Sequence, residues 1–297
     1  MMVPPLGIGL SYQVQVAPFL EERPDAFDYL EVVPDITWTD LGPGARPRYV
    51  EDRPTIEFLE RIGKSKPIVA HSIGLSIGSA HRLDLEHVDQ MARWYDRFRF
   101  PWHSDHLAYH LAEDEGGDLN MNLTMPVALD RETLETVAGR VSWVQARIPA
   151  PFLIENNVYY FTLEGEDYDE ATFLSELCRT TGCGLLLDLH NLYTNCRNSG
   201  ADPYAYLSHL DLEQVVEIHV AGGMELEGMY VDAHSGPSPE PVWELLDWTL
   251  PRCPSLGGVT FELFGSWFDT MGEDGLLRQL DRMREQWARH HAEPVLR

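Results

Sequence analysis

Short apolar segments alternate with helix-forming segments along the whole chain. Strands are predicted at residues 6–12, 29–33, 67–72, 102–108, 151–157, 184–191, 215–220 and 258–264. This regular alternation predicts a parallel sheet in an α/β fold. Eight such units in a chain of 297 residues favour a closed (β/α)₈ TIM barrel over an open doubly wound sheet. We therefore expect a single TIM-barrel domain over residues 1–297.

Helices are predicted between these strands. They cover residues 17–22, 50–62, 84–99, 130–147, 169–180, 241–250 and 275–290, and another begins at Asp202. Asp at the start of such a segment suits a helix N-cap, because its carboxylate accepts hydrogen bonds from free backbone N–H groups. Residues 41–47 and the segment around Gly116 and Gly117 are expected to be loops.

The chain is strongly acidic. Its 48 Asp and Glu residues against 22 Lys and Arg give a formal net charge of −26. Such a surface repels nucleic acids and anionic membranes, and it tolerates or attracts a basic peptide. Solubility or adaptation to salt is the simpler explanation of the charge. We expect neither a nucleic acid nor a membrane as partner.

A cytoplasmic location is expected. No apolar run approaches the roughly 20 residues that span a bilayer. The N-terminus has no basic segment followed by the apolar core of a signal peptide. The cysteines form no CxxC pair, so free, reduced thiols are expected at Cys178, Cys183, Cys196 and Cys253.

Polar side chains gather at the carboxyl ends of the last six predicted strands. They are His71, Asp105, His106, Glu155, Asn156, Asn157, Asp188, His190, Asn191, His219 and Glu262, with Asp232 and His234 just beyond the seventh strand. In a TIM barrel these strand ends converge on the active-site face. Residues far apart in the sequence are therefore expected to meet there. His81, His87, His103, His110 and His209 are expected to be surface or helix residues outside this group.

A metal centre explains this group better than separate structural roles do. Each residue alone has a structural explanation as a hydrogen-bonded histidine or a salt-bridge partner. Together, imidazoles and carboxylates in one apolar mouth repel or stay unpaired unless a metal binds them. Nitrogen and oxygen ligands without cysteine suit Fe, Mn, Zn or Co. The number of ligands favours two or three ions with a bridging carboxylate. If the strand stays regular to its end, pleating places Asp188 and His190 on one face and Asn191 on the other.

Seven short motifs, in order along nearly the whole chain, resemble the DUF692 family. They are His71-Ser-Ile-Gly74, Ser104-Asp-His-Leu107, Leu153-Ile-Glu-Asn156, Leu187-Asp-Leu-His-Asn191, Glu217-Ile-His219, Asp232-Ala-His-Ser235 and Phe261-Glu-Leu263. That family comprises multinuclear non-haem iron-dependent oxidative enzymes, including the iron oxidase of methanobactin biosynthesis. The resemblance implies a TIM barrel with O₂ as co-substrate and a ribosomally made precursor peptide as substrate. Oxidation at a Cys or a C-terminal Asp is implied.

The resemblance also implies a set of ligands for two or three irons in mixed Fe(II)/Fe(III) states. Two irons would be held, with Glu155 bridging, by His71, His106, Glu155, Asp188, His219 and Glu262. A third would be held or flanked by Asn156, Asn191, Asp232 and His234. Glu155, Asp188 and His219 are the expected catalytic residues. A separate companion protein that binds the leader segment of the precursor is a further implied partner.

His190 departs from the family pattern, because related sequences often carry Asn there. Three roles stay open: an added ligand, an effect on the occupancy of the third iron, or a pocket wall. Two other functions also stay open. One is a divalent-metal barrel enzyme similar to xylose isomerase or endonuclease IV, although the acidic charge disfavours DNA and no strand end offers a catalytic lysine. The other is a non-catalytic metal- or peptide-binding barrel.

Overall fold

The computed structural model describes residues 3–114, 117–161, 163 and 165–290. Over these residues, eight parallel strands close into a barrel in the order β1-β14-β11-β10-β9-β6-β5-β2. Their bounds are β1 Gly7–Ser11, β2 Tyr29–Val32, β5 Ile68–Ser72, β6 His103–His106, β9 Phe152–Glu155, β10 Gly184–Asp188, β11 Val215–Ala221 and β14 Gly258–Glu262. The predicted (β/α)₈ barrel is confirmed.

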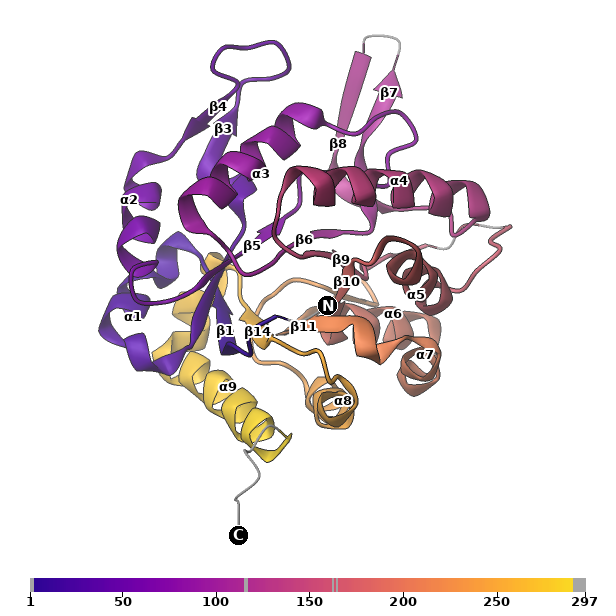
Figure 1. Cartoon of the computed structure of the whole chain (residues 1–297). Coiled ribbons are helices and arrows are strands. Elements are labelled where there is room, and N and C mark those ends of the chain that lie inside the picture. Colours follow the sequence, from indigo (N-terminus) through magenta and orange to yellow (C-terminus); the bar gives the residue numbers. More distant parts are fainter. Residues whose placement is uncertain (1–2, 115–116, 162, 164, 291–297) are drawn as a thin grey trace.

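Helices surround the barrel, and at least one follows each barrel strand (Figure 1). They are α1 Ala17–Glu22, α2 Arg53–Ile62, α3 Leu85–Phe98, α4 Arg131–Arg147, α5 Glu170–Thr181, α6 Leu189–Ser199, α7 Pro203–His209, α8 Glu240–Thr249 and α9 Phe268–His290. Several begin at the predicted Asp: the carboxylates of Asp84, Asp130 and Asp169 each accept a backbone N–H three residues later. None of the described helices has the length and apolar character that crossing a membrane requires.

The barrel interior is mostly apolar at its lower level, where Glu217 is a buried carboxylate bonded to Tyr29 and Trp102, and polar at the strand ends. The lower cluster consists of Tyr29, Val69, Trp102, Leu153, Leu186 and Val216. Side chains two positions apart share one face of a strand, so Leu153 and Glu155 both point inward, with Glu155 one layer nearer the carboxyl end. The same offset relates Leu186 to Asp188. The fold therefore stacks a ring of polar side chains on an apolar floor.

Three antiparallel hairpins interrupt the βα pattern. They are β3 Trp38–Asp40 with β4 Tyr49–Glu51, β7 Ala108–Asp114 with β8 Gly117–Pro126, and β12 Met224–Leu226 with β13 Met229–Val231. The first two project on the same side of the molecule, above the barrel in Figure 1.

Two sequence-based expectations are wrong at these hairpins. The helix predicted from residue 50 begins at Arg53, because β4 takes residues 49–51 and Asp52 caps the helix through Thr55 N–H at 3.1 Å. The loop predicted around Gly116 and Gly117 is largely strand: Gly117 begins β8, while Gly116 lies outside the described residues.

Candidate metal centre

Glu155, at the end of β9, lies at the middle of the polar ring. Its Oε2 is 3.3 Å from His71 Nε2 and 3.2 Å from His106 Nε2. Its Oε1 is 3.9 Å from His219 Nδ1. The side chain is 1% exposed. Three strands of the barrel, β5, β6 and β11, thus aim imidazoles at one buried carboxylate.

Among the described residues, three groups of side chains bring potential ligand atoms within 4.8 Å of one another, as a metal ion requires. They are His71, His106 and Glu155; Glu155, Asp188 and His219; and Glu31, His219 and Glu262. Glu155 belongs to two groups, and so does His219. Adjacent groups that share a carboxylate have the arrangement of a centre in which that carboxylate bridges two ions.

Glu31, in β2, is a member that sequence reasoning missed. Its Oε2 lies 2.8 Å from His219 Nε2, and both side chains are fully buried. The other ring nitrogen of this imidazole, Nδ1, is 3.1 Å from Glu262 Oε2. His219 is therefore clamped between two carboxylates. In the sequence, this residue could have been noticed as a single acidic residue inside the apolar segment 29–33.

Burial and mutual charge shift these groups strongly. Burial raises the pKa of Glu155 well above its usual range and that of Asp188 to about 6. Burial also lowers the pKa of His71, and that of His106 to about 4, so both imidazoles are neutral near pH 7. Burial alone would lower the pKa of His219. The nearby carboxylates of Glu262 and Glu31 outweigh burial, so the pKa of His219 is raised well above its usual range. His71 and His106 can therefore bind a metal without losing a proton, whereas a metal ion must displace the proton that burial keeps on Glu155.

The donor set fits metal ions. Buried ligand-type atoms without a hydrogen-bond partner among the described residues include Glu155 Oε2, His106 Nδ1, His219 Nδ1, Asn191 Oδ1 and Glu31 Oε1. Leaving such atoms unpaired inside a protein is costly. Nitrogen and oxygen donors of this kind suit iron and other first-row metals. The residues present therefore fit a multinuclear centre.

Strand β10 ends at Asp188, three residues earlier than predicted. Asp188 Oδ1 accepts the N–H groups of His190 at 2.6 Å and Asn191 at 2.8 Å, so the carboxylate caps α6, which starts at Leu189. His190 and Asn191 lie in the first helical turn. The expectation that Asp188 and His190 share a strand face is therefore wrong, because pleating stops before His190.

Asn156 and Asn191 tie β9 to β10 and α6. Asn156 bonds both backbone groups of Asp188, through Nδ2 to its carbonyl at 2.9 Å and through Oδ1 from its N–H at 2.8 Å. Asn191 Nδ2 donates to the Asn156 carbonyl at 3.1 Å and lies 3.4 Å from Glu155 Oε1. Both amides hold Glu155 and Asp188 in place. Asn191 keeps Oδ1 unbonded, whereas both amide atoms of Asn156 are used.

Asp232 and His234 meet His190 and Glu262 at the edge of the ring. Asp232 Oδ1 lies 3.0 Å from His234 Nε2 and 2.9 Å from His190 Nδ1. His234 Nε2 is also 3.7 Å from Glu262 Oε2. Against the effect of burial, Asp232 raises the pKa of His234 to about 10. All ten residues predicted as ligands thus lie in one connected cluster, with His190 beside it.

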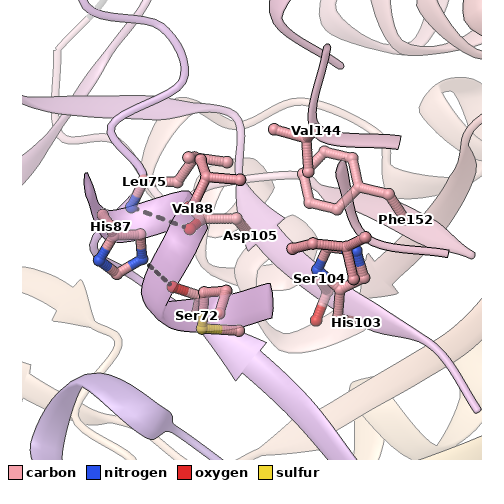
Figure 2. A pocket seen from close by; sticks show the side chains of 11 residues that line it. Ser72, Leu75, His87, Val88, His103, Ser104, Asp105, Val144 and Phe152 are labelled. Atoms are coloured by element: carbon pink, nitrogen blue, oxygen red, sulfur yellow. Dashed lines mark hydrogen bonds between the residues drawn. The ribbon is translucent and has the colours of Figure 1, made fainter. Parts of the chain in front are cut away.

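Asp105 and Ser72 point away from this cluster. Asp105 accepts the Leu75 N–H at 3.1 Å, and the Ser72 hydroxyl lies 3.0 Å from His87 Nε2 (Figure 2). They line a cavity of about 10 Å³ beside α3, which is too small for a substrate. Asp105 is therefore separated from the strand-end group in which the sequence placed it.

His103 is not the surface residue that was expected. It is 2% exposed in β6 and packs on Phe152, with 4.8 Å between ring centroids. Burial lowers its pKa to about 3. It is a neutral core residue outside the cluster.

Beyond Asn157, the chain is held by Glu170 and Asn195. Asn195 bonds the Asn157 carbonyl at 2.9 Å and the Tyr159 N–H at 3.1 Å. Glu170 accepts from the Tyr159 hydroxyl at 3.1 Å and is 8% exposed. Burial raises the pKa of Glu170 to about 7. This carboxyl therefore keeps its proton in the folded protein at pH values where the unfolded chain has lost it.

Replacing Glu170 by Gln is expected to remove a pH-dependent loss of stability. Because the folded-state pKa is raised, stability is fully present below about pH 4.5 and falls as pH rises toward 7. The advantage of Glu170→Gln should thus grow by about 3 kcal/mol over that interval, at about 1.4 kcal/mol per unit. Urea unfolding of both metal-free proteins at several pH values measures it. A constant difference across the range would contradict this assignment.

Comparisons with known proteins agree with this architecture. A family model described as "RiPP precursor modification enzyme MbnB/TglH/ChrH" matches residues 6–263. A UPF0276 protein from Caulobacter vibrioides is 30% identical over 91% of this chain and 90% of its own length. Another from Chromobacterium violaceum is 34% identical over 80% of this chain and 79% of its own.

Solved structures resemble the chain in fold. D-psicose 3-epimerase from Clostridium cellulolyticum matches with a TM-score of 0.58 and 12% identity, over 96% of this chain and 99% of that one. Endonuclease IV from Thermus thermophilus matches with a TM-score of 0.56 and 15% identity, over 95% and 99%. At such low identity these similarities show the barrel fold alone.

Proposed function

Since the chain belongs to the MbnB/TglH/ChrH family of enzymes that modify precursors of ribosomally synthesised and post-translationally modified peptides (RiPPs), we propose that it is an O₂-dependent non-haem iron oxidoreductase. Its substrate is a precursor peptide, oxidised at a Cys or a C-terminal Asp. The observation that carries the proposal is Glu155, one buried carboxylate common to two groups of nitrogen and oxygen ligands.

In this proposal two irons are held by His71, His106, Glu155, Asp188, His219 and Glu262, with Glu155 between them. Asn156, Asn191, Asp232 and His234 hold or flank a third. Bound iron, in mixed Fe(II)/Fe(III) states, supplies O₂ activation and Lewis acidity toward a thiolate or carboxylate of the substrate. The neutral His71 and His106 are ready to ligate without losing a proton.

Residues around the proposed centre hold its ligands in fixed positions and exclude water. Asp188 is held by Asn156 through both of its backbone groups and caps α6 with one carboxylate oxygen. His219 keeps one nitrogen on Glu31 and turns the other toward Glu262. The apolar floor formed by Leu153 and Leu186 excludes water from below. Such preorganisation limits side reactions of a reactive centre.

The cavity and the acidic charge near Asp232 suit a peptide substrate. The Tyr160 hydroxyl accepts the Asp232 N–H at 3.2 Å and also borders a cavity of about 570 Å³. Asp169, Glu170 and Asp202 line that cavity, and none of its described lining residues is Lys or Arg. With a chain charge of −26, this favours a peptide segment that carries basic residues. A separate leader-binding companion and a cytoplasmic location complete the proposal.

Anaerobic purification is expected to yield two or three irons per chain. The peptide encoded by a short neighbouring reading frame ending in Cys or Asp should change mass only when iron and O₂ are both present. Iron analysis and mass spectrometry of the peptide measure this, with chelated enzyme and zinc-loaded enzyme as controls. Full turnover without O₂, or with zinc alone, would show a metal-barrel enzyme of another class.

A further inference from the structure

Tyr230, in β13, is fixed against α6 from several sides. Asn198 of α6 donates to the Tyr230 carbonyl at 2.8 Å and accepts its N–H at 2.9 Å. The ring packs on Tyr193, with 5.4 Å between centroids, and lies under the Arg197 guanidinium at 4.4 Å. Tyr230 is 6% exposed. Its hydroxyl therefore has a defined position beside the first turn of α6.

That hydroxyl belongs to a chain of hydrogen bonds that ends on Asp232. Gly223 N–H donates to Tyr230 Oη at 2.9 Å, and Oη lies 3.2 Å from His190 Nε2. His190 Nδ1 lies 2.9 Å from Asp232 Oδ1. His190 is fully buried.

The chemistry of the end groups sets the direction of these bonds. A carboxylate only accepts, so the hydrogen of His190 sits on Nδ1 and points at Asp232. Nε2 is hydrogen-bonded to the Tyr230 hydroxyl, whose oxygen accepts from Gly223. In this arrangement each group in the series of hydrogen bonds from Gly223 to Asp232 has a partner. Both ring nitrogens of His190 are used, and neither remains for a metal ion.

We propose that His190 is a positioning residue that holds Asp232 in the orientation required by the third iron, with Tyr230 fixing the imidazole. This inference rests on the proposed function, because it takes Asp232 and His234 as holding that iron. His234 Nε2 approaches the same Oδ1 of Asp232 from another side at 3.0 Å. Asp232 follows the β12–β13 hairpin, and without His190 its carboxylate would lose one of its two imidazole partners.

Tyr230→Phe, which removes the hydroxyl, is expected to lower the affinity for the most weakly bound iron about 10-fold. A partner hydrogen-bonded directly to a metal ligand contributes about 10–100-fold to metal affinity, and Tyr230 acts one bond further out, through His190. His190→Ala should cost more, and the double variant no more than His190→Ala alone, because both act through one chain of bonds. His190→Asn should restore affinity toward wild type, since the amide N–H stands near the position of Nδ1–H.

An anaerobic Fe(II) titration against a chromophoric chelator measures each binding step, and the Mössbauer spectrum identifies the iron that is lost. Tyr193→Phe is the matched control: it removes a hydroxyl from the same aromatic cluster, and that hydroxyl accepts from Arg197 at 2.9 Å rather than bonding His190. It should bind iron as wild type does. The tighter steps should be unchanged in every variant.

Two results would overturn the inference alone. One is loss of an iron in His190→Ala together with unchanged binding in Tyr230→Phe, which would make His190 a ligand. The other is equal weakening in Tyr230→Phe and Tyr193→Phe, which would reduce the effect to packing. A wild-type chain that binds no iron would instead overturn the proposed function, and this inference with it.

Discussion

Glu155→Gln is expected to abolish peptide oxidation and to remove iron from the centre, while making the metal-free protein more stable. The amide keeps the shape of the side chain but loses the charge that two groups of ligands share. A partner one bond removed from a ligand already contributes about 10–100-fold to affinity, so loss of the shared ligand should exceed 100-fold. Burial raises the pKa of Glu155, so a neutral amide suits the empty pocket better than a carboxylate.

Three measurements separate these effects: iron per chain, turnover of the precursor peptide, and the melting temperature after chelation. Glu170→Gln is the matched control, because Glu170 is also buried with a raised pKa but lies at the start of α5 beside Tyr159. It should raise the melting temperature and leave iron binding intact. If Glu155→Gln kept its full iron content, Glu155 would be a structural carboxyl and the centre would need another bridge.

The barrel and most of the cluster are predictable because both follow from one repeated rule. An apolar run buried on both faces marks most of the parallel strands, with β6 the exception, and the carboxyl ends of such strands meet on one face. Once the strands were assigned, residues as distant as His71 and Glu262 had to converge.

The junction between β10 and α6 could not be read from hydrophobic pattern. Leu189 and Leu192 continue the apolar run of β10, so the pattern extends past the point where the strand stops. What ends it is local: Asp188 captures two N–H groups and starts a helix without an intervening loop. Only the hydrogen bonds show this, and they turn His190 from a strand residue into one that faces Tyr230.

Glu31 was missed for a different reason. A lone acidic residue inside a short apolar strand has no periodic signal, and its direction is decided only when the barrel closes. Closure sets β2 beside β1 and β5 and sends Glu31 across the interior to His219. The hairpins were missed because their strands are short or polar and lie outside the repeating βα units.

Glu31→Ala is expected to weaken iron binding by about 100-fold, and Glu31→Gln by about 10-fold. The Glu31 carboxylate accepts from His219 Nε2 at 2.8 Å, which leaves Nδ1 facing Glu262 and Glu155. Glutamine can still accept that bond through its carbonyl and keep the ring oriented, but it lacks the charge that makes the imidazole more basic. Alanine removes both contributions, so the ring is free to turn. Competition titration with Fe(II) measures the affinities.

Glu217→Gln is the matched control for this prediction. Glu217 is a fully buried carboxylate one layer below His219. It is hydrogen-bonded to Tyr29, Thr260 and Trp102, whereas its Oε1 stays 3.9 Å from His219 Nε2, beyond hydrogen-bond distance. Its substitution should lower stability, because those three donors lose a charged acceptor, and leave iron affinity near that of wild type. Equal losses of affinity in Glu31→Gln and Glu217→Gln would indicate general damage to the barrel interior. Loss of one whole iron equivalent in Glu31→Gln would instead make Glu31 a ligand, extending the centre by one strand to β2.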